Sequence, residues 1–353
     1  MAKADLPYQR AAMVLQGGGA LGAYQVGVFE ALQEAEYALD WFAGTSIGAI
    51  NAPDERLANL TRFWERIGWP ELGFVPGNGP VRRAYNHWSG MMATWLGQPG
   101  FFFRPRFPNP WLLSGHPEVA SYYDNDDLRT TLQELIDPDI VNSGKVRLSL
   151  GAVDVASGRQ VYFDSRQQEI RIEHVLASGA LPPAFSPVEL GGSWSCTPLD
   201  VVIDDNPRVS TLVFMVDVFD GAGALPSTMD EAAARQKEIT YATRSGRSIE
   251  AHRTMHNLRR AVNAMWETLP PAAQADPHLQ ELARLRCVTT MSIVHILYHA
   301  TDSETSFMDH DFSHSSIQDR RARGYSDAKA LLARPDWLEP PPEDIGVIVY
   351  GKI

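Results

Sequence analysis

The feature that most constrains the fold is a strand, a glycine turn and a helix, which occur in that order twice near the N-terminus. The apolar run 11–15 (AAMVL) stops at Gly17-Gly18-Gly19, and apolar residues then recur at helical spacing over 22–34. A second short strand at 39–43 leads through another glycine turn into a further helix. Strand–turn–helix units in succession are typical of a parallel sheet covered by helices, so we expect an α/β fold.

Later segments continue this alternation. A strand pair is expected at 146–153 and 160–163, a fully buried parallel strand at 211–218, one or two long helices over 229–269, and further strands at 288–298 and 347–350. Residues 69–123 differ, because they are rich in Trp, Phe, Pro and Gly and have no period of 2 or 3.6 residues. We interpret 69–123 as an aromatic insertion with short helices. Its aromatic residues either form structural core or, over 88–111, a cap over an acyl-chain site.

Composition narrows the class of protein. The chain of 353 residues is 44% hydrophobic, which is enough for a core, and its formal net charge of −12 argues against nucleic acid as a partner. No apolar run is long enough to span a bilayer, no apolar leader follows the first residues, and Cys196 and Cys287 cannot form a disulfide framework. We therefore expect a cytoplasmic enzyme. We expect any contact that it makes with the inner membrane surface to be peripheral.

Each glycine motif is open to more than one interpretation when it is taken alone. Gly17-Gly18-Gly19-Ala20-Leu21-Gly22 fits a dinucleotide loop, an anion-cradling loop whose N–H groups face an oxyanion, or a tight turn. Gly44-Thr45-Ser46-Ile47-Gly48 is a G-x-S-x-G nucleophile elbow between a strand and a helix, with Ser46 at its centre. The elbow follows the first motif at a spacing that makes chance unlikely, and the pair indicates an esterase-type serine site.

Together the two motifs resemble those of bacterial patatin-like phospholipases. The resemblance rests on MVLQGGGALGAYQVGVFEAL at 13–32, DWFAGTSIGAINA at 40–52, LASGALPPAFSPVEL at 176–190 and TLVFMVDVF at 211–219. It implies a three-layer α/β sandwich with a mostly parallel central sheet. It also implies two parts, an acyl hydrolase domain at 1–220 and a helical C-terminal extension at 221–353 that is packed on the core.

The resemblance also implies roles for particular residues. Ser46 matches the nucleophile, Gly44 and Gly48 match the elbow, and Gly17, Gly18, Gly19 and Gly22 match the oxyanion loop. The activity implied is a lipid acyl hydrolase of the phospholipase A or esterase type that uses a Ser–Asp dyad. Such an enzyme acts on a lipid or ester and needs neither a metal nor an organic cofactor. The oligomeric state does not follow from the sequence.

The dyad aspartate has no counterpart at the place where the resemblance puts it. A D-G-[GA] motif is expected shortly before Thr197-Pro198-Leu199, but the sequence there reads VELGGSWSCTPL, with the expected position between Trp194 and Ser195. No aspartate lies between Asp164 and Asp200.

A second shortening follows Ala52, in the helix after Ser46. Either the chain is a deletion variant without its base, or two short stretches are missing from this sequence. We favour the second explanation, because the helix after Ser46 would otherwise be barely two turns long. Asp220 begins a literal D-G-A, but it follows a strand where the resemblance places an ordinary loop, and Asp-Gly is a common turn dipeptide. We therefore expect that Asp220 is not the base.

Two other classes of function stay open. A nicotinamide-dependent oxidoreductase would use the loop at Gly17 and would have Asp40, about 20 residues on, as its ribose-binding acid. A family member without the dyad aspartate would bind lipid without hydrolysing it. The histidines carry no metal motif, since H-E-x-x-H is absent, and none of them is nominated as a partner of Ser46.

Overall fold

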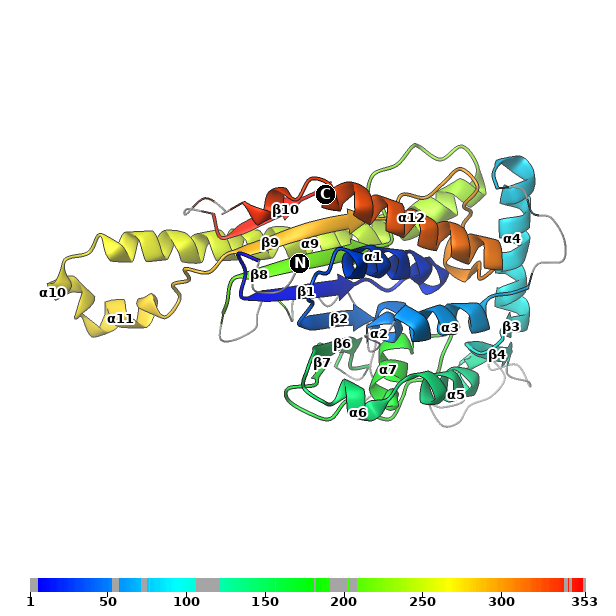
Figure 1. Ribbon diagram of the computed structural model, residues 1–353, viewed down its shortest axis with the longest axis horizontal. Coiled ribbons are helices and arrows are strands. Elements are labelled where there is room, and N and C mark those ends of the chain that lie inside the picture. The colour runs from blue at the N-terminus through cyan, green and yellow to red at the C-terminus, as the bar shows by residue number, and fades with distance from the viewer. Residues whose placement is uncertain are drawn as a thin grey trace.

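The computed structural model describes residues 6–351 except 53–56, 71–74, 76, 106–120, 156, 181, 191–201, 203–207, 340–341 and 343–344. Its strands are β1 (Arg10–Leu15), β2 (Trp41–Thr45), β3 (Gly97–Gln98), β4 (Phe102–Pro105), β5 (Tyr123–Asp124), β6 (Arg147–Val153), β7 (Gln160–Asp164), β8 (Thr211–Asp217), β9 (Met291–Leu297) and β10 (Val347–Tyr350). Figure 1 shows their arrangement.

The α-helices are α1 (Ala23–Glu34), α2 (Ile47–Asn51), α3 (Leu57–Ile67), α4 (Gly79–Leu96), α5 (Asp126–Leu135), α6 (Pro138–Val141), α7 (Ile172–Gly179), α9 (Met229–Glu267), α10 (Pro271–Gln274), α11 (Pro277–Ala283) and α12 (His314–Leu332). Short 3-10 helices lie at η2 (Gly19–Gly22), η5 (Met308–His310) and η6 (Asp336–Leu338).

A seven-stranded sheet in the order β10-β9-β8-β1-β2-β6-β7 forms the centre of the molecule. Only the edge strand β7 is antiparallel to its neighbour within this sheet, so the expected mostly parallel sheet is confirmed. Leu15 at the end of β1 is in register with Gly44 of β2 and with Val216 of β8. The two glycine motifs therefore leave the sheet at the same edge, side by side.

Helices cover both faces of this sheet, which gives the three layers that the sequence implied. Side chains of β1 alternate between the faces: Met13 and Leu15 join the core cluster that contains α1, whereas Ala12 and Val14 join the cluster that contains Ile249 of α9. All six residues of β1 are buried, as expected for a parallel strand with helices on both sides.

The C-terminal segment is helical, as expected, and it also adds β9 and β10 to the central sheet. Its helix α12 lies directly against α1 (Figure 1). A Cβ added at Gly27 of α1 would lie 1.9 Å from the carbonyl oxygen of Arg321, and one at Gly324 would lie 2.0 Å from that of Tyr24. The two backbones can approach this closely only because glycine stands at both positions.

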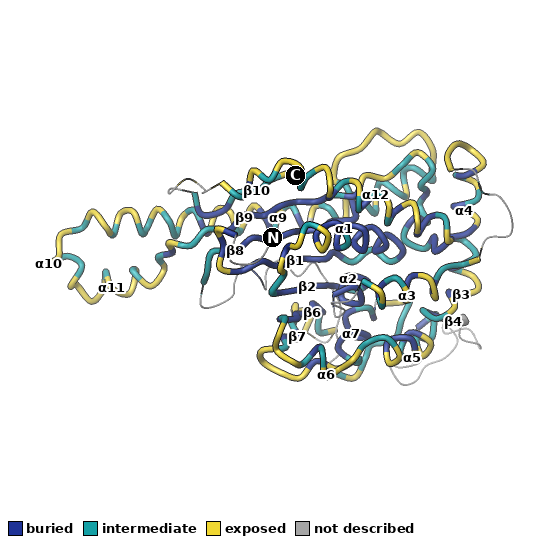
Figure 2. The backbone as a smooth tube through the Cα atoms, viewed as in Figure 1, coloured by how far each residue is buried: buried dark blue, intermediate teal, exposed yellow. Residues whose placement is uncertain are grey.

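Helix α9 is one continuous helix of 39 residues that begins with a capping box between Thr228 and Glu231. Its C-terminal half and the short helices α10 and α11 project beyond the sheet (Figure 1), and Figure 2 shows this arm as mostly exposed or half-buried.

The aromatic insertion differs from the expectation of short helices. It contains α4, a helix of 18 residues, and a separate three-stranded sheet in the order β3-β4-β5. The buried face of α4 is made of polar and small residues, among them Arg82, Asn86, Ser89 and Ala93, whereas Trp88 and Trp95 are exposed. A search for apolar periodicity misses α4 for this reason. Among the described residues, no helix combines the length and the apolar character needed to cross a membrane.

Candidate active site

Ser46 stands at the turn between β2 and α2 in a backbone conformation that L-residues rarely adopt. Its φ is 53° and its ψ is −119°. Holding a non-glycine residue in this region costs on the order of 1–3 kcal/mol, and strain of this kind is found at functional sites. Two hydrogen bonds connect the turn to β6. The Ser46 N–H donates to Ser178 Oγ (3.0 Å), and the Ser178 hydroxyl donates to the Gly151 carbonyl (2.6 Å).

The flanking glycines of the elbow leave no room for side chains. A Cβ at Gly44 would lie 2.1 Å from the carbonyl oxygen of Gly48, and a Cβ at Gly48 would lie 2.3 Å from that of Leu15. These contacts give the steric reason for the G-x-S-x-G spacing. The helix α2 that follows has only five residues, and 53–56, beside the shortening noted after Ala52, lie outside the described residues.

The loop that follows β1 lies directly against the elbow. A Cβ at Gly17 would be 3.1 Å from Ser46 Cβ, and one at Gly22 would be 2.4 Å from Cγ1 of Ile47. Gly18 has extended backbone (φ 175°), and Gly19 has a φ of 55°. The structure thus brings the four glycines of the first motif and the serine of the second into one site.

Two buried amides outside the glycine motifs hold the first glycine loop in place: Asn51 ties it to the helix after the elbow, and Gln16 ties it to the residue that follows β8. Asn51 donates to the Gly22 carbonyl (3.0 Å) and accepts from Trp64 Nε1 (3.1 Å). Gln16 accepts from the Val218 N–H through its side-chain oxygen (2.7 Å). Gln16 directly precedes the first glycine motif, and Asn51 closely follows the second. This position beside the motifs is the one sequence signal that could have identified the two amides.

A cavity of about 180 Å³ opens beside Ser46. Most of its wall is apolar, and the lining includes Ile50, Phe101, Phe102, Leu128, Leu176, Phe185, Phe219 and Phe312. Phe101 and Phe102 belong to the aromatic insertion, which therefore contributes to the cavity as the cap hypothesis requires. Trp111 of the same insertion lies outside the described residues.

The C-terminal segment supplies the polar part of this wall through Asp309 and His310. Asp309 Oδ1 lies 2.7 Å from Lys237 Nζ and 2.9 Å from His310 Nδ1. Burial alone would raise the pKa of Asp309, but the neighbouring His310 and Lys237 outweigh it and hold this pKa well below its usual range. No motif in the sequence marks Asp309 or His310 as part of this site.

Other sequence candidates lie elsewhere. Asp220 does not line the cavity; its carboxylate is 2.5 Å from His299 Nδ1 and accepts from the Ala222 N–H (2.8 Å). Asp40 accepts from the Ala11 N–H (2.9 Å), at the edge of the sheet opposite the glycine loop. A ribose-binding acid would have to lie on the loop's side, so this geometry contradicts the dinucleotide alternative. Trp194, Ser195 and 197–199 lie outside the described residues.

The histidines of the described residues belong to no candidate metal site. His295 Nε2 of β9 lies 3.0 Å from Asp217 Oδ2 in a buried hydrogen bond, and no group of three or more potential ligands gathers among the described residues. Cys287 is buried without a disulfide, and Cys196 is outside the described residues.

The fold and the site define a class: three-layer α/β proteins in which a serine elbow faces a triple-glycine loop at the carboxyl edge of a parallel sheet. The patatin-like phospholipase family model matches residues 13–217, and a second model, described as patatin phospholipase, matches residues 239–344. The chain belongs to the patatin-like phospholipase family, which confirms the resemblance seen in the sequence.

Among solved structures, VipD from Legionella pneumophila is similar over 93% of this chain and 67% of its own, with 14% sequence identity and a TM-score of 0.37. No curated protein matches the chain.

Proposed function

We propose that this protein is a serine-dependent lipid acyl hydrolase of the phospholipase A or esterase type. Membership of the patatin-like phospholipase family supports acyl ester hydrolysis in general terms. The observation that carries the proposal is the position of Ser46, held at a φ of 53° beside the glycine loop and at the wall of a largely apolar cavity.

The chemistry follows from these positions. Ser46 Oγ attacks the carbonyl carbon of an ester, and backbone N–H groups of the loop at 17–19 stabilise the negative charge on the carbonyl oxygen. The serine proton passes through a base to the leaving alcohol. Water then hydrolyses the acyl-enzyme, so neither a metal nor an organic cofactor takes part.

The apolar wall indicates the kind of substrate. An acyl chain placed against Phe101, Phe102 and Phe185 would lose its contact with water, at a gain of about 0.8 kcal/mol for each buried CH₂. A lipid or other long-chain ester therefore fits the cavity, and such a substrate would bring the protein into peripheral contact with a membrane surface.

A Ser–Asp dyad also needs an aspartate as its base. The matching position has no aspartate, and among the described residues Asp309 is the one carboxylate that lines the cavity. Its interactions with Lys237 and His310 make it a poor proton acceptor. The missing aspartate favours a second candidate function, a family member that binds lipid without turnover.

Replacing the nucleophile tests both candidates. Ser46→Ala should abolish hydrolysis of p-nitrophenyl butyrate, because no acyl-enzyme can form without the hydroxyl. Ser143→Ala is the matched control, since this serine is exposed and, among the described residues, its side chain forms hydrogen bonds only with Ile140 and Lys145 of its own turn. Equal kcat/KM for the wild type and Ser46→Ala would refute the hydrolase. A wild type that shows no turnover but binds a fatty acid would instead support the second candidate.

A further inference from the structure

The glycine loop after β1 is enclosed by several neighbours, and one of them belongs to the C-terminal segment. A Cβ at Gly18 would lie 2.4 Å from Cγ2 of Val218, the residue that follows β8. A Cβ at Gly19 would lie 2.3 Å from the carbonyl oxygen of Asp309. Asp309 lies in the loop between β9 and α12, residues 298–313, which we call the C-terminal loop. This loop therefore forms one side of the enclosure around the glycine loop.

The contact at Gly19 joins backbone to backbone. The short helix η2, which begins at Gly19, packs against η5 of the C-terminal loop. Gly19 also has a φ of 55°, a conformation that favours glycine. Because neither side of this contact is the end of a flexible side chain, a shift of the C-terminal loop requires a shift of the glycine loop.

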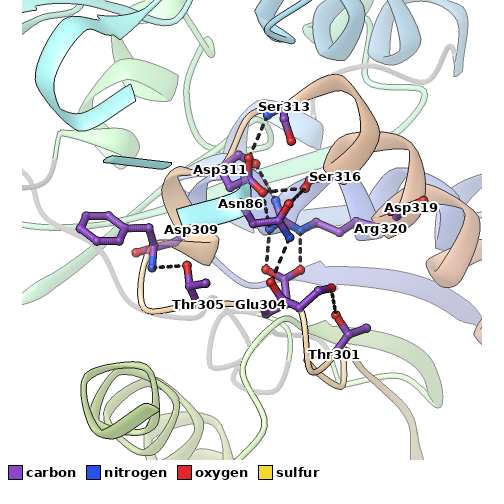
Figure 3. Close-up of polar contacts among 12 residues, drawn as sticks. Asn86, Thr301, Glu304, Thr305, Asp309, Asp311, Ser313, Ser316, Asp319 and Arg320 are labelled. Atoms are coloured by element: carbon purple, nitrogen blue, oxygen red, sulfur yellow. Dashed lines mark hydrogen bonds and ion pairs between the residues drawn. The ribbon is translucent and has the colours of Figure 1, made fainter. Parts of the chain in front are cut away.

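A buried polar network holds the C-terminal loop in place (Figure 3). Arg320 of α12, 1% exposed, forms two hydrogen bonds with Glu304 (2.9 and 3.2 Å) and donates to the Asp311 carbonyl (2.8 Å). The Asp311 carboxylate in turn accepts from Ser316 (2.6 Å). Asp309 lies between Glu304 and Asp311 in the sequence, so the network fixes the loop on both sides of Asp309.

Lys237 of α9 holds the C-terminal loop at Asp309 itself. Its amine donates to the Ser306 carbonyl (2.8 Å) and to Asp309 Oδ1 (2.7 Å). Within the described part of the chain, Lys237 is the one residue outside the C-terminal loop whose side chain forms a hydrogen bond with the Asp309 side chain. The side chains of Lys237 and Asp309 are 31% and 17% exposed, so this ion pair is partly withdrawn from water. The position of Asp309, and through it that of Gly19, therefore depends on Lys237.

The glycine loop needs such support because its own sequence restricts it little. The three consecutive glycines at 17–19 have more backbone freedom than any other residue type. Backbone N–H groups stabilise an oxyanion only when they point to the place where its charge develops. Neighbouring elements must therefore fix the direction of these N–H groups.

We propose that Lys237 is a positioning residue for the glycine loop: it holds Asp309 against Gly19, so that the C-terminal segment completes the oxyanion site. The inference rests on the proposed function. Lys237 does not touch the ester, and it acts through the backbone of the C-terminal loop. Its loss should weaken the binding of the transition state more than the binding of the substrate, so kcat should fall while KM stays nearly constant.

Removing Lys237 also has an electrostatic effect, which has to be separated from positioning. Without the amine, the carboxylate of Asp309 loses its ammonium partner at the cavity wall, and its negative charge opposes a developing oxyanion. The double variant Lys237→Met/Asp309→Asn removes both charges but does not restore the hydrogen bond from α9. A positioning role predicts that both variants lose activity, whereas a charge effect alone predicts that the double variant recovers it.

The test compares the wild type with Lys237→Met, Lys237→Met/Asp309→Asn, Ser46→Ala and Lys329→Met as full chains. Lys329 is the matched control, because its amine also pairs with a carboxylate, that of Glu34 (3.2 Å), but it does not line the cavity. Circular dichroism monitors the folding of each variant.

Two kinds of measurement are made on these proteins. The first gives kcat and KM for p-nitrophenyl butyrate. The second is amide hydrogen exchange by mass spectrometry, in segment 16–23 and, as a reference, in segment 41–45 of β2. The Leu21 N–H, which donates to the Gly18 carbonyl (3.1 Å), reports on the glycine loop within the first segment. A general loss of stability would accelerate exchange in both segments, whereas a local one would accelerate it only in the first.

We expect Lys237→Met and the double variant to lose roughly 10- to 100-fold in kcat, less than the 10² to 10³ that removal of an oxyanion donor costs. The KM of both should stay within about threefold of the wild type. Exchange in 16–23 should become at least about tenfold faster in both variants, with exchange in 41–45 unchanged. Lys329→Met should match the wild type within about threefold in every quantity, because its ion pair is exposed.

Three results would each overturn the proposal. The first is exchange in 16–23 that stays within about tenfold of the wild type, or that accelerates equally in 41–45. The second is a loss in kcat below about tenfold, or one that comes with a rise in KM above about threefold. The third is recovery of kcat in the double variant, because the loss would then come from the charge of Asp309.

The proposed function fails separately in this experiment. If Ser46→Ala hydrolyses the ester as fast as the wild type, or if the wild type shows no turnover, the hydrolase is refuted. The exchange rates alone then decide whether Lys237 holds the glycine loop. If Ser46→Ala loses activity while Lys237→Met keeps both its activity and its exchange rates, the hydrolase stands and Lys237 has no positioning role. Should Lys237→Met fail to fold, Lys237→Gln replaces it with the same criteria.

Discussion

Replacing Arg320 with Met should destabilise the protein strongly. The change removes two hydrogen bonds to Glu304 and one to the Asp311 carbonyl, and it leaves the Glu304 carboxylate, 9% exposed, with only the Tyr298 hydroxyl (2.7 Å) among its described partners. Removing one partner of a buried ion pair lowers the free energy of unfolding by about 3–5 kcal/mol, because the other charge stays buried without compensation. Urea unfolding followed by tryptophan fluorescence would measure the loss in the free energy of unfolding.

The adjacent residue provides the control for this measurement. Arg321 also pairs with a glutamate, Glu30, at 3.0 Å, but that pair is partly exposed (21% and 27%), so Arg321→Met should cost less than about 1 kcal/mol. The double variant Arg320→Met/Glu304→Gln removes both buried charges, and its cost should fall below the sum of the single changes by about 1–3 kcal/mol. If Arg320→Met costs less than about 1 kcal/mol, the network does not hold the loop.

The remaining predictions concern the cavity wall and its charges. Phe101→Ala should lower kcat/KM more for p-nitrophenyl laurate than for the butyrate, by up to about 0.8 kcal/mol for each CH₂ that loses its contact; equal losses would make Phe101 purely structural. Asp220→Asn should keep activity within about tenfold of the wild type, whereas a base would contribute roughly 10² to 10⁴; a loss of that size would promote Asp220 to the dyad. Asp309 has a lowered pKa in the folded state despite its burial, because of His310 and Lys237, so its contribution to stability is fully present above the unfolded value of about 3.9 and is lost progressively as the pH falls from there toward the lowered folded pKa. The destabilisation by Asp309→Asn should therefore shrink between about pH 5 and pH 3 in urea titrations, and a constant difference would contradict the ion pairs.

The parts of the fold that the sequence predicted are those with strong local patterns. The apolar runs of β1 and β8 are buried over their full length, and the elbow at Ser46 is bounded by glycines whose positions tolerate no Cβ. Helix α4 escaped prediction because Arg82 and Asn86 occupy its buried face. Arg82 can do so because its guanidinium donates to Ser316 of α12 (3.0 Å), a contact between distant segments that no local pattern records.

The same holds for the candidate site: the residues that belong to a local motif could be predicted, and the others could not. Both glycine motifs are contiguous in the sequence, so their chemistry could be inferred before their geometry was known. His310 and Asp309 reach the cavity from the far end of the chain, because β9 joins the sheet beside β8 and the following loop crosses the glycine loop. Only the topology of the sheet brings these residues to the wall of the cavity beside Ser46, and a single sequence carries no direct sign of that topology.

The central claim is that Ser46 is the nucleophile. The most direct measurement is the mass spectrum of the intact and digested protein after reaction with a fluorophosphonate. Our account predicts one adduct, on the peptide that contains Ser46, and no adduct in Ser46→Ala. Labelling at a different residue, or no labelling in a protein that hydrolyses esters, would contradict it.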